Sequence, residues 1–165
     1  MRTIASGIGA TLDEARQGMR SILRTFSESI PRETRRLPLA PGTSLRALIQ
    51  GECCSMEDGG AVGPFDVHKP FGGFCIQLID DGETKVVVYS RGGMLLKVAG
   101  LQADSVGQPV YAMAGGQFGL EEGAEMGQVF AIENVERGLA VVGFRMIGDH
   151  RPFVVNGRLL ERDRH

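Results

Sequence analysis

The sequence predicts a mainly β protein, with an antiparallel β-barrel or sandwich-like body, an N-terminal α-helix and an extended arm. Glycine makes up 24 of the 165 residues, about twice its usual share of ~7%. Short apolar runs separated by turn residues begin at Thr43, a spacing typical of sandwiches and barrels. A helix-capping motif and a proline-punctuated stretch precede them. The length allows one domain with a hydrophobic core.

Residues 11–30 carry the pattern of one amphipathic helix. Thr11 and Glu14 form a T-x-x-E capping box, which satisfies the first free amides of a helix. Apolar residues then recur at three- and four-residue steps, while arginines line another face. The apolar stripe comprises Leu12, Ala15, Met19, Ile22, Leu23 and Phe26, and the arginines are Arg16, Arg20 and Arg24. An isolated helix of this length is marginal in water, so we expect the stripe to be buried against the body or a partner.

The stretch PRETRRLPLAPG predicts an extended arm. Pro31, Pro38 and Pro41 punctuate it, and it has neither helical nor strand periodicity. Ten residues in a polyproline-like conformation span roughly 31 Å, enough to reach an adjacent molecule. We therefore divide the chain into a helix and arm (1–42), a barrel-like body (43–148) and a C-terminal tail (149–165).

The body is predicted as an antiparallel meander or barrel, with a long irregular loop at residues 51–73. The expected strands are Ser44–Gln50, Phe74–Ile79, Thr84–Ser90, Met94–Val98, Pro109–Ala114, Met126–Ile132 and Leu139–Ile147. Glycine-containing turns are expected at Asp80–Glu83, Arg91–Gly93, Ala114–Gly116 and Glu136–Gly138. Long loops inside compact domains are often contact surfaces.

Charge is distributed unevenly along the chain. Residues 1–37 hold seven arginines and four acidic residues, for a net charge of 7 − 4 = +3, and residues 151–165 hold 4 − 2 = +2. Residues 38–150 hold 7 − 14 = −7. Such basic ends suit an acidic protein surface, a neighbouring copy or nucleic acid, or are simply solvated termini.

Several partners and locations are not expected from the sequence. Nucleic acid is disfavoured because eight Phe and two Tyr, with no Trp, are not interleaved with the arginines as stacking platforms require. No apolar run is long enough for a membrane span, and Met1–Ala10 lacks signal-peptide features. We expect a soluble protein made in a cytoplasm, with no membrane partner.

No pattern of catalytic or metal-binding residues stands out. Cys53, Cys54 and Cys75 are expected to be free thiols, and no zinc spacing, nucleophile elbow or phosphate loop is present. The alternative is a small hydrolase or metal-dependent enzyme in the 51–73 loop, with Cys53 or Cys54, Asp66 and His68 as working groups. We expect no enzyme activity, no cofactor and no metal.

The segment Leu101–Met146 resembles the C-terminal half of phage head-decoration proteins, also called capsid cement proteins. The resemblance lies in GQPVYAMAGGQFGL followed by GAEMGQVFAIENVERGLAVVGFRM. Its order is a glycine-led V-Y-A strand, a turn ending in F-x-L, a glycine-led strand and a final valine-rich strand. The pieces are Gly107–Ala112, Phe118–Leu120, Gly127–Ile132 and Leu139–Arg145. The resemblance covers under a third of the chain and implies a barrel-like body that binds the outside of a viral shell, often as a trimer, with an arm reaching its neighbours.

The leading hypothesis is therefore a capsid decoration protein on the outer capsid surface of a virion. Its expected partners are the major capsid protein and itself, as a homotrimer. Residues 1–45 are expected to clamp adjacent capsid subunits, with added backbone hydrogen bonds along Arg32–Leu39. The expected contact residues are Leu12, Arg16, Met19, Arg20, Leu23, Arg24, Phe26, Arg32, Arg35, Arg36, Leu37 and Leu39. Another virion component with the same barrel, such as a tail or head-completion protein, stays open.

Overall fold

The protein is mainly β and antiparallel in the computed structural model, which describes residues 30, 32–80, 82–155 and 158–159. Nine strands form one sheet and two further strands form a small hairpin. The strands are β1 (Glu33–Pro38), β2 (Cys53–Met56), β3 (Val62–Pro64), β4 (Phe71–Asp80), β5 (Thr84–Lys97), β6 (Pro109–Met113), β7 (Gln117–Gly119), β8 (Ala124–Asn134), β9 (Leu139–Arg145), β10 (Val154–Val155) and β11 (Arg158–Leu159). Short 3-10 helices are η1 (Leu45–Ala47), η2 (Asp58–Gly60) and η3 (Ala114–Gly116).

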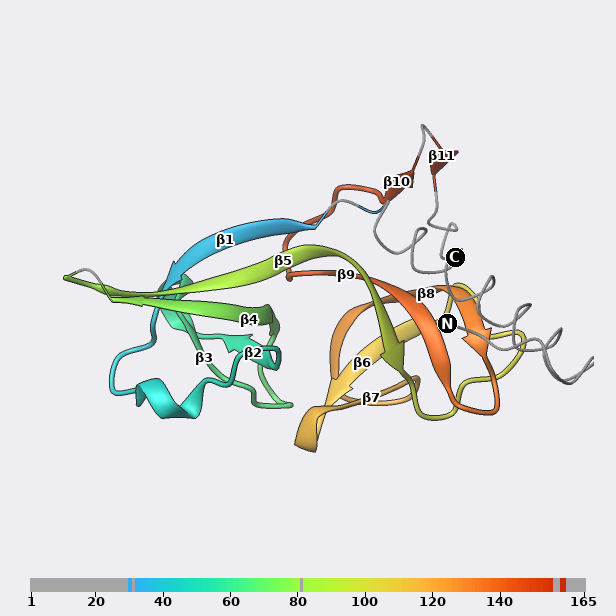
Figure 1. The fold of residues 1–165 in the computed structure, drawn as a ribbon, viewed down its shortest axis with the longest axis horizontal. Coiled ribbons are helices and arrows are strands. Elements are labelled where there is room, and N and C mark those ends of the chain that lie inside the picture. Colours follow the sequence, from blue (N-terminus) through green and yellow to red (C-terminus); the bar gives the residue numbers. More distant parts are fainter. Residues whose placement is uncertain (1–29, 31, 81, 156–157, 160–165) are drawn as a thin grey trace, which may run out of the picture.

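Strand β5 is shared by two curled lobes, which lie side by side in Figure 1. Its first half pairs with β1 on one edge and β4 on the other, and its second half pairs with β9. The first lobe consists of β1 to β4 with the start of β5, and the second lobe consists of β6 to β9 with its end. Two isolated parallel bridges bring the outer strands of each lobe together, Leu39 with Val62 and Ala99 with Gly119. Each lobe is therefore barrel-like.

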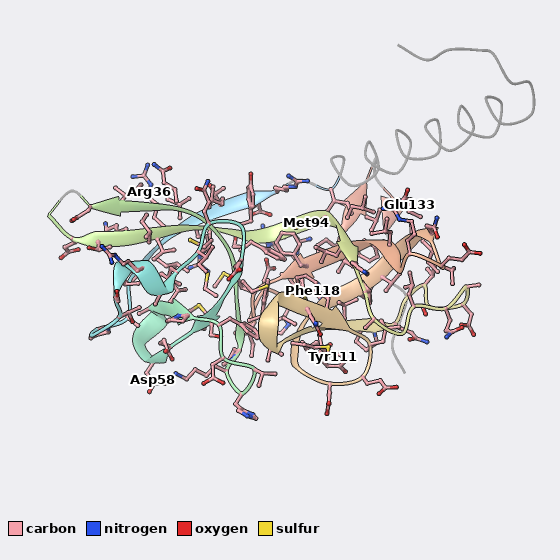
Figure 2. The ribbon with its side chains drawn as sticks, turned by 60° about the horizontal axis from the view of Figure 1, so that its bottom comes forward. Arg36, Asp58, Met94, Tyr111, Phe118 and Glu133 are labelled. Atoms are coloured by element: carbon pink, nitrogen blue, oxygen red, sulfur yellow. The ribbon has the colours of Figure 1, made fainter. Side chains whose placement is uncertain are left out.

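Each lobe encloses its own hydrophobic core. The core of the second lobe is formed by aromatic and aliphatic residues around Phe144 of β9, and Phe71 and Phe74 extend into it from β4 of the first lobe. The three rings meet edge to face. The first lobe is filled by smaller side chains from all five of its strands and by Met146, which follows β9. Figure 2 shows side chains filling both lobes, with Met94 and Phe118 in the second. Met146 thus ties the end of one lobe to the core of the other.

The chain runs straight through Arg91–Gly93, where the sequence analysis predicted a turn. Gly92 lies opposite Phe144 and Gly93 lies opposite Gly143, so both belong to the β5–β9 ladder. Gly92 has φ +151°, and a Cβ atom there would lie 2.7 Å from Cγ of Arg32. Gly92 therefore makes room for a crossing side chain, and the chain does not reverse there. The turn prediction was wrong here.

Most other predicted strands and turns are confirmed. Strands β4, β6, β8 and β9 cover the predicted runs to within a few residues. Strand β5 covers both Thr84–Ser90 and Met94–Val98, apart from Val98. The predicted turns at 80–83, 114–116 and 136–138 connect antiparallel neighbours. The predicted strand Ser44–Gln50 was wrong: it contains helix η1, whose first turn is capped by the Ser44 hydroxyl accepting from the Arg46 amide.

Residues 51–73 are not the irregular loop that was predicted. Strands β2 and β3 form a hairpin within them, and β2 also pairs with β4. The glycines suggested a loop, but Gly72 is needed because a Cβ there would lie 2.8 Å from the Ser55 carbonyl carbon. Close backbone packing explains that glycine better than a loop does.

The two chain ends are described only in part. The predicted helix at residues 11–30 lies outside the described residues except for Ile30. Within the predicted arm, Glu33–Pro38 form β1 and pair with β5 of the same chain. In the predicted tail, β10 and β11 pair with each other. The division into 1–42, 43–148 and 149–165 stays a prediction.

Candidate partner-binding surface

Strand β1 has one edge paired with β5 and one edge open. The Leu39 amide donates to the Thr84 carbonyl at 3.3 Å, one step beyond the Pro38–Lys85 pair. In an antiparallel ladder, every second residue directs its amide and carbonyl to the same neighbouring strand. Because Leu39 bonds toward β5, Leu37 also turns its amide and carbonyl toward β5. The backbone groups of Arg36 consequently face away from it.

The alternation also explains why a proline is tolerated in β1. Pro38 faces outward like Thr34 and Arg36, so its missing N–H removes no bond to β5. Within the described part of the chain, Thr34 and Arg36 pair with no strand other than β5. Beyond Pro38 the edge closes, because the Ala40 amide donates to Val62 at 2.9 Å. The parallel bridge of Leu39 with Val62 also places the Val62 amide against the Pro38 carbonyl. The open edge therefore extends from Thr34 to Leu37.

The arginines predicted to contact a partner lie along or beside this edge. Arg35 and Arg36 are exposed on β1, and Figure 2 labels Arg36 on the first lobe. Arg32 is exposed just before β1, where its guanidinium lies 5.7 Å from the Tyr89 ring centroid and donates to the Gly93 carbonyl at 3.1 Å. Three cations thus lie within five residues of chain.

The apolar members of the predicted contact set are placed differently. Leu37 is buried in the core of the first lobe, and Leu39 packs half-buried against the same core. Both side chains thus pack on the body while β1 is paired with β5, and their predicted contact with a partner stays a prediction. The remaining predicted contact residues, Leu12, Arg16, Met19, Arg20, Leu23, Arg24 and Phe26, lie outside the described residues.

Arg91 holds both ends of the body together at the junction of the lobes. It is buried on β5 and donates to the carbonyls of Arg151 and Pro152 at 2.8 and 2.6 Å. Its guanidinium also lies 3.4 Å from the Glu33 carboxylate and 3.5 Å from that of Asp149. The cation therefore joins the start of β1 to the segment after β9.

Burial and charge shift the pKa values of this network in opposite directions. Burial lowers the pKa of Arg91, although Asp149 and Glu33 act against that shift. The side-chain hydrogen bond from Arg151 lowers the pKa of Asp149 from 3.8 to about 2. The hydrogen bonds that Arg151 gives to Asp149 and then Glu33 raise its own pKa. Arg91, Asp149 and Arg151 are therefore charged at neutral pH.

A small satellite core anchors both chain ends next to this network. Ile30 and Phe153 are each 1% exposed and pack with Phe130. The Phe153 ring meets Phe130 at 5.1 Å and lies 4.2 Å below the Arg91 guanidinium. Ile30, at the start of the described chain, and Phe153, near its end, therefore lie at one place on the body.

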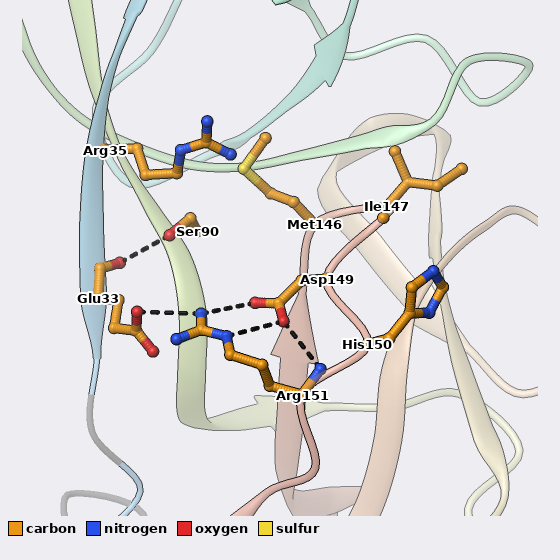
Figure 3. Close-up of a pocket in the computed structure, with 9 residues that line it drawn as sticks. Glu33, Arg35, Ser90, Met146, Ile147, Asp149, His150 and Arg151 are labelled. Atoms are coloured by element: carbon orange, nitrogen blue, oxygen red, sulfur yellow. Dashed lines mark hydrogen bonds and ion pairs between the residues drawn. The ribbon is translucent and has the colours of Figure 1, made fainter.

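A pocket of about 570 Å³ lies beside the Glu33 end of β1 (Figure 3). Glu33 and Arg35 form one wall, and the segment from Met146 to Arg151 forms the other. Its lining combines buried Ser90 and Met146 with Ile147, which is 68% exposed. Such a mixed apolar and charged pocket suits a side chain of a partner better than a buried small molecule.

The groups of the alternative enzyme site do not form a catalytic arrangement. Burial raises the pKa of Cys53 and of Cys54 to about 12, and the Cys54 thiol donates to the Gly73 carbonyl. The Asp66 carboxylate accepts from the amide of His68, whose side chain is exposed. A thiol nucleophile needs a lowered pKa and a nearby base; here burial shifts the cysteines the other way.

The described part of the chain offers no metal centre or membrane helix. Within it, no group of three or more His, Cys, Asp or Glu side chains is placed to hold a metal ion. None of the helices in these ranges has the length and apolar character needed to cross a membrane.

Sequence reasoning found the arginines of β1 but missed the groups that position it. Arg91 was assigned to a turn, and Asp149 and Phe153 were assigned to a tail. The run Phe153–Val155 is apolar, and this was the one local signal that the tail returns to the body. The chain matches no protein-family model, no curated protein and no solved structure.

Proposed function

We propose that this protein is a structural virion protein that binds the outer surface of a phage capsid and stabilises contacts between neighbouring capsid subunits. The observation that carries the proposal is the open edge of β1, with exposed Arg35 and Arg36, beside the place where both chain ends anchor. The basic strand edge and the two anchored residues Ile30 and Phe153 thus lie at one end of the junction between the lobes. That arrangement suits attachment to a large acidic surface.

The sequence resemblance gives this surface a specific partner class. The resembling segment forms β6 to β9, which build most of the second lobe. In the proposed arrangement the second lobe is the compact body, and the first lobe and the chain ends contact the major capsid protein. Self-association as a homotrimer belongs to the same proposal, as does a location on the outer capsid surface.

The role proposed for the protein is mechanical rather than catalytic, and it needs no cofactor. A stable shell contact needs at least about 1,000 Å² of buried surface. In this proposal the basic residues of 1–29 and their apolar stripe also contact the shell and add area to the β1 edge. Repeated attachment to a lattice then raises the overall affinity without further contacts.

Co-sedimentation of the full chain with assembled phage heads tests this function. The variant R35E/R36E reverses two charges on β1, and R46E/R137E reverses two charges at exposed positions elsewhere. We expect wild type and R46E/R137E to pellet with heads at a fixed ratio per capsid subunit, and R35E/R36E to lose at least tenfold in affinity. Raising the salt concentration should weaken wild-type binding.

Two results would count against the proposal. If wild type does not pellet with heads at any salt concentration, the protein has no shell partner of this kind. If the β1 variant binds as tightly as R46E/R137E, the basic edge plays no part. Light scattering on the purified chain addresses the homotrimer separately, because a monomer at all concentrations contradicts it.

A further inference from the structure

We infer that β1 receives an extended segment of its partner by strand addition, and that this segment carries two adjacent acidic residues beside Arg35 and Arg36. This inference rests on the proposed function and specifies the chemistry of the partner at that site. It differs from a simple charge contact because backbone hydrogen bonds at defined positions carry part of the binding.

The backbone of β1 supplies these hydrogen bonds at alternate residues. Thr34 and Arg36 each turn an amide and a carbonyl outward, as the register with β5 requires. The Pro38 carbonyl faces Val62 through the bridge at Leu39. Leu37 and Arg35 already direct their backbone groups to β5. An added strand is therefore held at Thr34 and Arg36, and Pro38 together with the closed edge at Ala40 ends the pairing.

The charges on β1 select which strand can be added. Edge strands often carry charges or proline that discourage unwanted pairing. Here Arg35 and Arg36 point to opposite faces of the sheet, as neighbouring residues in a strand do. A second copy of β1 would bring arginine beside arginine, which is unfavourable across strands. A partner strand with acidic residues on both faces places an opposite charge beside each arginine.

The pocket next to β1 indicates the residue that accompanies the acidic pair. Side chains of Glu33 and Arg35 share one face of β1, and that face borders the pocket of about 570 Å³. Met146 and the exposed Ile147 lie across it, as Figure 3 shows. A strand added to β1 projects every second side chain over the same face. We therefore expect an apolar residue in the partner segment to enter this pocket.

A short synthetic peptide tests strand addition without any shell. The probe is the blocked peptide TVTEEVTV, and the matched control is TVTKKVTV. Amide hydrogen exchange of the full chain is followed by NMR with each peptide at concentrations up to about 1 mM. We expect the acidic peptide to slow exchange of the Thr34 and Arg36 amides, and to leave Leu37, already bonded to β5, unchanged. The lysine peptide should protect neither amide.

Two substitutions at one position separate the backbone from the charge. Arg36→Ala removes the cation and keeps the outward amide, whereas Arg36→Pro removes both and spares the bonds to β5, as Pro38 does. We expect R36P to bind the acidic peptide about tenfold more weakly than R36A, the effect of one lost hydrogen bond. Thermal denaturation verifies that both variants fold, and the exchange measurement on wild type does not depend on them.

The outcomes distinguish this inference from the proposed function. Equal peptide affinity of R36A and R36P, or unprotected Thr34 and Arg36 amides, overturns strand addition even if the chain still binds phage heads. Protection that appears without peptide and grows with protein concentration identifies a second copy as the occupant and also overturns it. Specific protection by the acidic peptide in a protein that ignores heads supports strand addition and refutes the capsid role.

Discussion

Replacing Arg91 with methionine removes the cation that joins the chain ends to the junction of the lobes. The substitution deletes two hydrogen bonds to main-chain carbonyls, at 2.8 and 2.6 Å, and the ion pairs with Glu33 and Asp149. The guanidinium stacked 4.2 Å from the Phe153 ring centroid is also lost. Methionine keeps an unbranched apolar stem of similar length, so little packing is lost.

The loss in the free energy of unfolding depends on how well water replaces the Arg91 guanidinium at the groups that it contacted. Hydrogen bonds from a charged donor are worth about 1.5–3 kcal/mol each, and removing one partner of a buried charge pair costs about 3–5 kcal/mol. Arg151 and Pro152 are exposed, so water replaces part of the lost bonding at their carbonyls. We therefore expect a loss of about 3 kcal/mol in the free energy of unfolding. For a chain of this size that lowers Tm by about 6–12 °C.

Urea denaturation and calorimetry of the full chain measure the effect. The matched control is Arg137→Met, which removes the same charge from an exposed turn residue and should change stability by no more than about 0.5 kcal/mol. A loss below about 1 kcal/mol for R91M would refute the reasoning. It would mean that the desolvation of the buried guanidinium cancels its contacts, and that the junction is held by Phe153 and Met146 instead.

Three further predictions concern backbone space, pH and thiol reactivity. Gly92→Ala should destabilise the protein more than Gly100→Ala in thermal melts, because its Cβ would meet Arg32 at 2.7 Å whereas Gly100, at φ +80°, has nothing within 4 Å; equal melting temperatures contradict this. The pKa of Asp149 is lowered from 3.8 to about 2 by Arg151, so its stabilising effect is complete above about pH 4 and lost toward pH 2; the stability deficit of Asp149→Asn should shrink over that range in denaturation experiments, and a constant deficit rules the linkage out. The three cysteine thiols should react with a thiol reagent at pH 8 far more slowly in the native protein than in urea, because burial raises the pKa of two of them to about 12 and also raises that of the third; one thiol that reacts quickly in native protein disproves it.

Local signals predicted the second lobe well. Its strands are alternating runs such as β6 or apolar runs such as β9, and its turns carry glycine where the chain reverses, as at Ala114–Gly116 and Glu136–Gly138. Both kinds of signal are complete within a few residues of sequence. The Arg91–Gly93 stretch has the same local appearance. Its Gly92 leaves space for Arg32, which is far away in sequence and crosses the strand there, and no window of local sequence contains that information.

The sequence likewise predicted one part of the candidate surface and missed another. The arginines of β1 were recognisable from composition, and the proline pattern correctly indicated an extended conformation. That β1 pairs with its own β5, and so buries Leu37, depends on a strand about fifty residues later in the chain. Arg91 and the exposed Arg137 each precede glycine in the sequence. Only Arg91 of these two is buried, because Phe153 and the carbonyls of Arg151 and Pro152 contact its guanidinium.

Sharing β5 between the lobes determines how the body responds to mechanical load. Two domains joined by a linker separate when the linker straightens, and each then unfolds by itself. Here a strand of 14 residues, roughly 46 Å long, runs through both lobes with β1 and β9 along one edge. A force that pulls the lobes apart along β5 loads many of these hydrogen bonds in shear together. Pulled as a single molecule, the body is expected to resist stretching and then to yield in one step.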